Sequence, residues 1–327
     1  MPNAIELQNL RKIFTFSVKN PRYSIWKNFF NPDRQEIVAV DSISLAVERG
    51  ESVAFIGPNG AGKSTTIKML AGILYPTSGT ISVLGLNPQR ERQRLSYNIG
   101  TVFGQRSQLV FNLPVRDSFR LFGKIYELSD RMIQQRQKEL VALFAIEDIM
   151  DQPVRKLSLG QRMRAEIAVS LIHRPKIIFL DEPTIGLDIV AKRRLREVLK
   201  NLNRKFGTTI FLTSHDAGDI EALCARTIII NHGRAILDME TAVLQRKFLT
   251  QKRVRVDFSQ PTKFTAIADT RLVHRDDNSV QFMVDTSKIA LKDVLDELTT
   301  HYSIEDMDVE HPSLEEIIST IYGQQAR

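Results

Sequence analysis

Residues 57–64, GPNGAGKS, place glycines, a lysine and a serine in the spacing of a loop that binds phosphate. Glycines let the backbone curl until successive N–H groups point at phosphate oxygens. The loop follows an apolar strand expected at 51–56 and precedes a helix expected at 64–74, whose positive dipole end favours an anion. We therefore predict that the chain grips the phosphates of a nucleotide through Gly57, Pro58, Asn59, Gly60, Ala61, Gly62, Lys63, Ser64 and Thr65.

Two adjacent acids, Asp181 and Glu182, follow the short apolar run IIFL. Charges at the end of a buried strand are costly unless a cation or a chain of water molecules uses them. Beside a phosphate loop, Asp181 suits coordination of Mg²⁺, and the hydroxyl of Ser64 suits the same ion. Lys63 is expected to reach the β- and γ-phosphates, and Glu182 suits polarisation of the water that attacks the γ-phosphate.

Short apolar strands and longer helical segments alternate around these residues. KIIFLD (176–181) is almost continuously apolar, as expected of a strand buried on both faces. The segment AKRRLREVLKNLNRK predicts a helix, TTIFLTS a strand and DAGDIEALC another helix, and a mostly helical stretch runs from about 115 to 173. This alternation predicts an α/β fold with a mostly parallel sheet.

The pattern changes towards the end of the chain. RVRVDF and SVQFMVD alternate apolar and polar residues, which predicts two strands with one buried face. Residues 291–298 have the apolar spacing of a helix packed on one face, and residues 303–309 suit another strand. A capping box at 313–316 starts a last helix. We predict a large domain at 1–240 and a small accessory α/β domain at 241–327.

Composition limits the settings in which the chain works. With 43% hydrophobic and 25% charged residues it has the composition of soluble globular proteins, and its net charge of +7 suits nucleic acid, an anionic membrane surface or nucleotide phosphates equally. One cysteine, Cys224, excludes an internal disulfide and suits a reducing cytosol. No segment approaches the ~18–20 apolar residues needed to cross a bilayer. A role at a membrane therefore requires a partner.

The segment LSLGQ, residues 157–161, precedes a predicted helix and ends 20 residues before Asp181. Together with GPNGAGKST and IIFLDEP, it resembles the signature of the ATP-binding cassette (ABC) ATPases, and the resemblance covers roughly residues 4–240. It implies a phosphate-loop NTPase core of the ABC type with a helical subdomain at about 105–173. It also implies hydrolysis of ATP to ADP and phosphate with Mg²⁺. The usual signature has glycine where this chain has Leu159.

The resemblance implies roles for residues within one subunit. Gln105, in VFGQRSQL, matches the loop that links the metal ion and the attacking water to the helical subdomain. His215, in LTSHD, matches the switch histidine that hydrogen-bonds the γ-phosphate. Phe14 aligns with the aromatic residue that stacks on adenine, and the nearby Phe16 is a rival for that role.

Other matching residues are implied to act across a dimer interface. Ser158, Gly160 and Gln161 match residues that contact the γ-phosphate of ATP held by the opposite subunit. Asp188, in IGLD, matches the acid of a loop that crosses the interface. Each subunit then carries half of each ATP site. We therefore expect two copies, or this chain and a paralogous ATPase subunit, to close head-to-tail around two ATP molecules.

The order of the motifs and the ending HPSLEEIISTIY most resemble ATPases of the exporter class, whose separate permease subunits each span the membrane about six times. The implied function is ATP hydrolysis that powers export, with integral membrane permease subunits as partners and no nucleic acid. The implied location is the cytoplasmic face of the cell membrane. The alternative is a soluble ABC ATPase acting on ribosomes or DNA, but such proteins usually carry two cassettes or a long coiled-coil insertion, and this chain shows one cassette without sustained heptads.

An aromatic and basic insertion, residues 17–36, interrupts the first predicted strands. It contains the aromatic residues Tyr23, Trp26, Phe29 and Phe30 among Lys19, Arg22 and Lys27. This composition suits a membrane interface or a permease contact. It equally suits a surface loop packed on its own domain.

Overall fold

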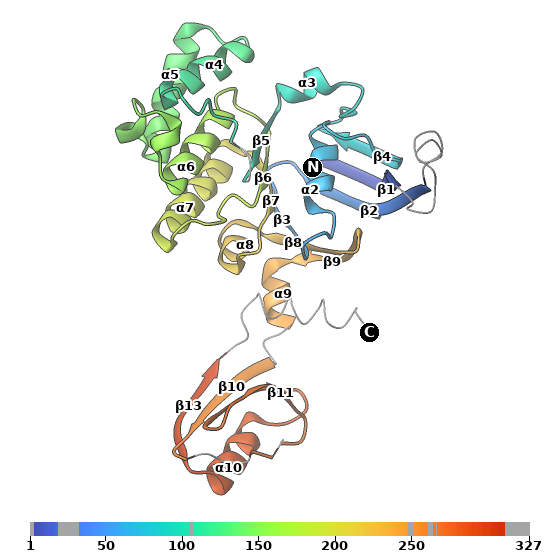
Figure 1. Cartoon of the computed structure of the whole chain (residues 1–327), viewed down its shortest axis with the longest axis vertical. Coiled ribbons are helices and arrows are strands. Elements are labelled where there is room, and N and C mark those ends of the chain that lie inside the picture. Colours follow the sequence, from blue (N-terminus) through green and yellow to red (C-terminus); the bar gives the residue numbers. More distant parts are fainter. Residues whose placement is uncertain are drawn as a thin grey trace. The chain divides into compact units, whose positions relative to one another are not determined.

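The computed structural model of the chain describes residues 3–18, 33–104, 107–247, 251–260, 264–265 and 267–310, and it divides into a larger unit, Met1–Met239, and a smaller unit, Glu240–Arg327 (Figure 1). Gln105, the greater part of the insertion at 17–36 and the helix predicted after residue 313 lie outside the described residues. None of the helices in these described ranges is long and apolar enough to cross a membrane.

A six-stranded sheet is the framework of the larger unit. Its strand order is β5-β6-β7-β3-β8-β9, and the ladders from β5 through β8 are parallel. Every residue of β3 and β7 is buried, because this sheet is covered on both faces. The strands are β3 Ser52–Ile56, β5 Ile99–Phe103, β6 Ile177–Asp181, β7 Thr209–Thr213, β8 Arg226–Asn231 and β9 Arg234–Glu240.

The helices of the larger unit fall between these strands in the sequence. Three of them, α4, α5 and α6, follow one another between β5 and β6 and pack together (Figure 1). The helix after the phosphate loop ends four residues earlier than predicted, because Gly72 adopts a left-handed conformation with φ of 70°. The helices are α2 Lys63–Leu70, α3 Arg92–Ser96, α4 Val115–Ile125, α5 Asp130–Phe144, α6 Leu159–Ser170, α7 Ile189–Phe206 and α8 Ala217–Leu223, with short 3-10 helices at Glu147–Ile149 and Val154–Lys156.

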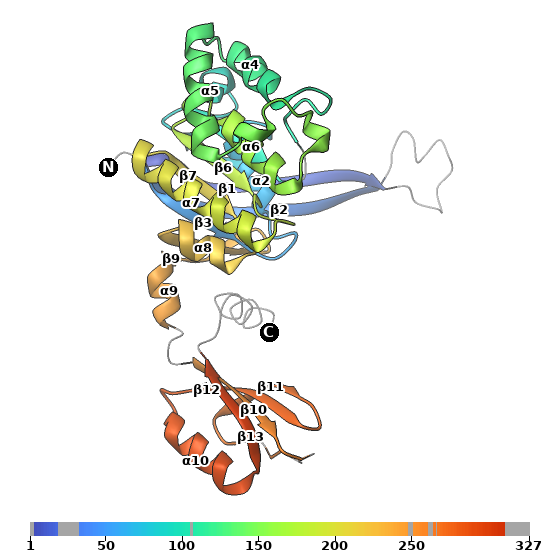
Figure 2. The same ribbon diagram turned by 90° about the vertical axis from the view of Figure 1, so that its left-hand side faces the viewer.

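A second, antiparallel sheet of order β2-β1-β4 packs against the central sheet. Leu10 and Val40 of this sheet share one buried cluster with Phe55 of β3 and Ile67 of α2. Figure 2 shows the paired β1 and β2 extending well beyond the rest of their sheet. Its strands are β1 Asn3–Val18, β2 Asp33–Glu48 and β4 Ser78–Val83.

The smaller unit has a core of its own. Its antiparallel sheet has the order β11-β12-β10-β13, and the apolar residues of β10 and β12 point alternately into a cluster with Val294 and Leu298 of the adjacent helix. This is the one-sided burial that the alternating sequence predicts. Its elements are α9 Thr241–Lys247, β10 Gln251–Phe258, β11 Thr270–Arg275, β12 Ser279–Asp285, α10 Leu291–His301 and β13 Ile304–Glu310.

Candidate nucleotide-binding site

The phosphate loop, the two acids and His215 meet where three parallel strands end. The phosphate loop follows β3, Asp181 is the last residue of β6, and His215 lies two residues beyond β7. Asp181 pairs in register with Thr213 of β7. Ligands of open α/β sheets bind beyond the carboxyl ends of the strands, and the fold brings the loop, the acids and the histidine to that edge.

The curl of the phosphate loop depends on glycine at defined positions. Gly60 and Gly62 have φ of 83° and 102°, in the region that side-chain-bearing residues avoid. A Cβ atom on Gly62 would lie 2.3 Å from the carbonyl oxygen of Ala39, so the tight approach of β2 excludes any side chain there. The first residue of α2 follows directly. The free N–H groups at the start of α2 therefore complete the cradle for an anion.

Lys63 is the centre of the polar contacts in the loop. Its Nζ donates to the carbonyl oxygen of Gly57 at 2.6 Å and to that of Pro58 at 3.2 Å. Burial lowers the pKa of Lys63, and the carboxylates of Glu182 and Asp181 oppose that decrease. The ammonium group is thus buried between the loop and both acids, where it can neutralise a phosphate.

Glu182 and His215 form the second cluster of contacts. The Nε2 atom of His215 lies 3.0 Å from Oε1 of Glu182 and 3.1 Å from Nζ of Lys63. In the neutral tautomer with the proton on Nδ1, Nε2 accepts from Lys63; when Nε2 carries a proton, it donates to Glu182. The side chain of Glu182 is 20% exposed and that of His215 is 47% exposed, so both are accessible to a ligand and to water.

Thr213 orients both acids, and the sequence did not identify it as a site residue. Its hydroxyl donates to Oδ1 of Asp181 at 2.6 Å. The backbone N–H of Glu182 donates to the Thr213 carbonyl oxygen at 3.0 Å and to its hydroxyl at 3.1 Å. These bonds hold Glu182 at φ of 55°, a left-handed conformation that costs about 1–3 kcal/mol in a non-glycine residue. Thr213 was interpreted only as part of a strand, because a β-branched residue fits that pattern without further explanation.

A buried carboxylate positions the segment that carries His215. Asp219 of α8 is fully buried and accepts from the hydroxyl of Ser214 at 2.7 Å, from Nε of Arg196 at 2.7 Å and from the hydroxyl of Thr184. A buried carboxylate is tolerated when it is paired in this way. The network joins α7 and α8 to the residue that precedes the histidine. No sequence motif marks this network, because its members lie apart along the chain.

The LSLGQ segment forms the start of α6. Ser158 is its N-cap: its hydroxyl accepts from the N–H of Gln161 at 3.2 Å, and the Gln161 side chain accepts from the N–H of Ser158 at 2.9 Å. Within the described part of the chain, no hydrogen bond or ion pair joins these residues to Lys63, Asp181 or His215. Asp188 caps the next long helix, α7, and accepts from the N–H of Ala191 at 2.8 Å.

Leu159, where the chain departs from the usual signature, packs against the loop that ends at Asp188. A Cβ atom on Gly186 would lie 2.8 Å from Cδ2 of Leu159, and a Cβ on Gly160 would lie 3.1 Å from that of Ala191. The start of α6 is therefore in direct contact with the IGLD loop and the start of α7. The glycines at 160 and 186 permit this approach.

The Leu159–Gly186 contact gives a testable prediction. We expect Gly186→Ala to lower ATP hydrolysis and stability, because the residue has φ of 71° and the new methyl group overlaps Leu159, an overpacking cost of about 1–3 kcal/mol. Adding Leu159→Ala should remove the cost of the overlap, because the side chain that the new methyl group meets is gone. The cost of the strained backbone at residue 186 should remain. The control is Gly85→Ala, with φ of 80° and no atom within 4 Å of the new Cβ. The ATPase rates and thermal midpoints of the two single variants and the double variant measure the coupling between residues 159 and 186. Strictly additive effects of the two substitutions would contradict the predicted contact.

Phe14 and Phe16 remain two candidates for an adenine contact. Phe14 lies on β1, half-buried, with Nζ of Lys12 5.1 Å from its ring centroid. Phe16 is 48% exposed, and the two ring centroids are 6.4 Å apart. The two rings therefore lie on the same part of β1, and the ring of Phe16 is the more exposed.

Two known families match the chain. The family described as ABC transporter matches residues 40–185, which contain the phosphate loop, the LSLGQ segment and both acids. The family described as ATP-binding protein DrrA1-3-like, C-terminal domain, matches residues 241–318.

Individual proteins are similar over longer stretches. The ABC transporter ATP-binding protein NatA of Bacillus subtilis is 36% identical over 207 residues, which are 63% of this chain and 84% of that protein. The linearmycin resistance ATP-binding protein LnrL of the same species is 29% identical over 296 residues, 88% of this chain and 94% of that protein. The Nod factor export ATP-binding protein I of Ralstonia nicotianae is 37% identical over 201 residues, 62% of each chain.

Solved structures show the same fold. The cbiO1 protein of Clostridium perfringens, part of the ABC transporter complex cbiONQ, superimposes with a TM-score of 0.60 at 26% identity, over 75% of this chain and 94% of that one. A dimeric bacterial ABC transporter cassette gives a TM-score of 0.59 at 25% identity, over 72% of this chain and 98% of that one. The predicted fold class is confirmed by these similarities.

Proposed function

The chain belongs to the ABC transporter family of ATP-binding subunits, and we propose that the residues gathered at the carboxyl ends of β3, β6 and β7 carry its ATP hydrolysis. The observation that supports this most directly is the position of His215 between Lys63 and Glu182. Its Nε2 atom lies 3.1 Å from Nζ of Lys63 and 3.0 Å from Oε1 of Glu182. Residues 57–65 hold the phosphates, and Phe14 stacks on the adenine. Glu182 takes a proton from the attacking water, while His215 donates a hydrogen bond to the γ-phosphate.

A magnesium ion fits the donor set beside the loop. Ser64 at the start of α2 offers a hydroxyl, and Asp181 at the end of β6 offers a carboxylate whose Oδ1 is oriented by Thr213. Gln105 is proposed as a further ligand. When bound, the ion neutralises charge on the β- and γ-phosphate oxygens. The hard oxygen donors of this set suit Mg²⁺.

The second half of each ATP site is proposed to come from a second subunit. Ser158, Gly160 and Gln161 lie at the N-terminus of α6, where free N–H groups favour an anion. We assign them to the γ-phosphate of ATP on the opposite subunit, with Asp188 at the interface between the two. Binding of ATP then favours the closed head-to-tail dimer, and loss of the γ-phosphate removes the group that joins the halves.

The dimer is proposed to power export through integral membrane permease subunits at the cytoplasmic face of the membrane. The larger unit acts as the ATPase domain and the smaller unit as an accessory domain. Two of the similar proteins are named for linearmycin resistance and for Nod factor export, which supports an exporter. A soluble ABC ATPase acting on ribosomes or DNA is not favoured, because the similar proteins described above are transporter subunits.

Mixing two inactive variants tests the divided site. Lys63→Ala removes the phosphate lysine, and Ser158→Arg blocks the start of α6, so each homodimer should be inactive. In a mixed dimer one composite site contains an intact Lys63 and an intact Ser158. We expect phosphate release to return to roughly a quarter of the wild-type rate on equimolar mixing, since half of the dimers are mixed and each has one intact site. Mixtures that stay as inactive as the separate variants would contradict the head-to-tail site.

A further inference from the structure

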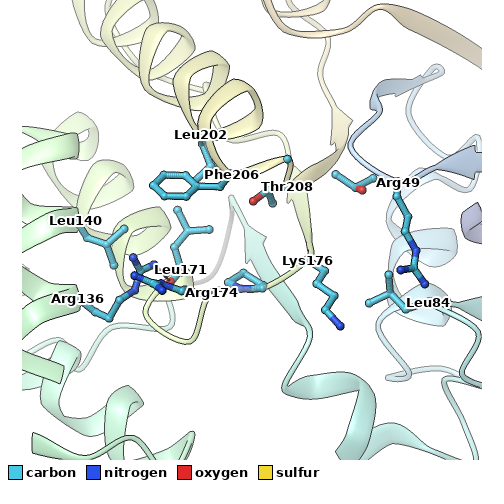
Figure 3. A pocket seen from close by; sticks show the side chains of 13 residues that line it. Arg49, Leu84, Arg136, Leu140, Leu171, Arg174, Lys176, Leu202, Phe206 and Thr208 are labelled. Carbon is cyan, nitrogen blue, oxygen red and sulfur yellow. Dashed lines mark hydrogen bonds between the residues drawn. The ribbon is translucent and has the colours of Figure 1, made fainter. Parts of the chain in front are cut away.

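A separate cavity of about 260 Å³ lies at the opposite ends of the same strands (Figure 3). Its lining includes Arg49 before β3, Lys176 before β6 and Thr208 before β7, whereas the nucleotide site lies after those strands. Each strand has five residues, so at ~3.3 Å per residue about 16 Å of sheet separates the two sites. The cavity is therefore distinct from the nucleotide site.

One wall of the cavity is apolar. Leu140 of α5, Leu171 after α6 and Leu202 of α7 are buried beneath it, and Figure 3 shows their side chains grouped on one side with Phe206. Phe206 at the end of α7 is 56% exposed and lines the cavity. An apolar body entering the cavity would cover this ring and remove apolar surface from water.

Cations line both sides of the cavity. Arg136 and Arg174 lie beside the leucines, whereas Lys176 and Arg49 lie across from them (Figure 3). Arg136 is fully engaged within the protein: it donates to Glu139 at 2.5 Å and to the carbonyl oxygen of Leu171 at 3.0 Å. It therefore has a structural role at the end of α6.

The remaining cations are available to a ligand. Arg174 contacts the same Glu139, but at 3.5 Å and with a side chain that is 63% exposed. Among the residues that the structure describes, Arg49 and Lys176 form no ion pair. Four cations and one carboxylate give a local charge of +3. The C-terminal ends of α6 and α7 oppose it with about half a charge each, so the field still favours an anion.

We propose that this cavity binds a small amphipathic carboxylate. The carboxylate is held by Arg49 and Lys176, and the apolar body lies against the leucine wall and Phe206. A water molecule takes about 30 Å³ of liquid, so the volume equals that of roughly nine water molecules. An eight-carbon carboxylate, with its eight carbon and two oxygen atoms, is close to that size, whereas the larger head group of a phosphate ester would leave less room for the apolar body that the wall requires.

Binding of octanoate to the full-length chain, measured by isothermal titration calorimetry, tests the proposal. We expect saturable binding at one site, with octanol and octylammonium at least about tenfold weaker because they lack the negative charge. The double variant Arg49→Glu, Lys176→Glu should lose at least tenfold in affinity for octanoate. The matched control is Lys138→Glu, an exposed cation on the opposite face of α5 from Arg136, which should stay within about twofold.

Two further measurements keep the result interpretable. Unchanged ATP affinity in the double variant would show that this variant is folded. Phe206→Asp replaces an exposed side chain on the apolar wall and should weaken octanoate binding independently of the cations. Saturating ATP should leave octanoate affinity unchanged within about twofold, because the sites lie at opposite ends of the sheet. Absence of saturable binding to the wild-type chain, equal binding by the double variant, or displacement of octanoate by ATP would overturn the proposal.

Discussion

Replacement of Glu182 by glutamine is expected to slow ATP hydrolysis by about 10²- to 10⁴-fold while ATP still binds. The amide keeps the shape of the side chain but cannot take a proton from water. The two hydrogen bonds from the N–H of Glu182 to Thr213 belong to the backbone, so they hold the same conformation in the variant. The variant therefore loses the ability to take a proton from water but keeps the backbone conformation of the site.

The ATP-bound dimer should accumulate in this variant, because the γ-phosphate that joins the halves is no longer removed. Phosphate release measures turnover, and light scattering with and without ATP measures dimerisation. Glu197→Gln, an exposed change on α7, is the matched control and should retain the wild-type rate within about twofold. A residual rate above one tenth of wild type in Glu182→Gln would rule out Glu182 as the base.

Replacement of Lys63 by alanine should abolish binding rather than turnover alone. A hydrogen bond to a charged group contributes about 1.5–3 kcal/mol, and the ammonium group is placed to serve two phosphates, so ATP affinity should fall by at least about 100-fold. The loop also loses the two bonds from Nζ to the carbonyl oxygens of Gly57 and Pro58. The substitution also removes the positive charge that balances the carboxylates of Asp181 and Glu182.

Equilibrium dialysis with ATP measures this loss directly. Lys68→Ala is the control, because Lys68 lies on the same short helix with an exposed side chain and should bind ATP as the wild type does. Thermal unfolding checks that the Lys63→Ala protein remains folded. An ATP dissociation constant within about threefold of wild type would show that the loop grips phosphate without its lysine.

The family and the ATPase activity were predictable from sequence because their chemistry is local. A phosphate loop works through consecutive N–H groups, so its glycines, lysine and serine must be contiguous, as in residues 57–64. The acids and the LSLGQ segment are likewise short runs attached to one strand or one helix. The similarities to ABC transporter subunits confirm these two predictions. The assignments of individual site residues stay predictions for the experiments above.

Only the tertiary structure revealed the residues that orient these groups. Thr213 binds both acids because β6 and β7 pair in register, and Asp219 is buried because α7 and α8 bring Arg196 and Thr184 to it. The contact of Leu159 with Gly186 joins segments on different elements. Such contacts leave no motif, because their members are spaced by the path of the chain rather than by the chemistry they share.

The cavity at the amino ends of the strands has the same origin. Its cations come from α5, from the segment between α6 and β6 and from the turn before β3, and no motif in the sequence links them. Strand pairing and helix packing place them around one apolar wall and thereby create a combined charge that none has alone. The sequence by itself determined which groups can bind and hydrolyse ATP, since each of these groups belongs to a short run of consecutive residues. The packed fold decided how those groups are oriented and which distant side chains act together, since long-range pairing fixes both.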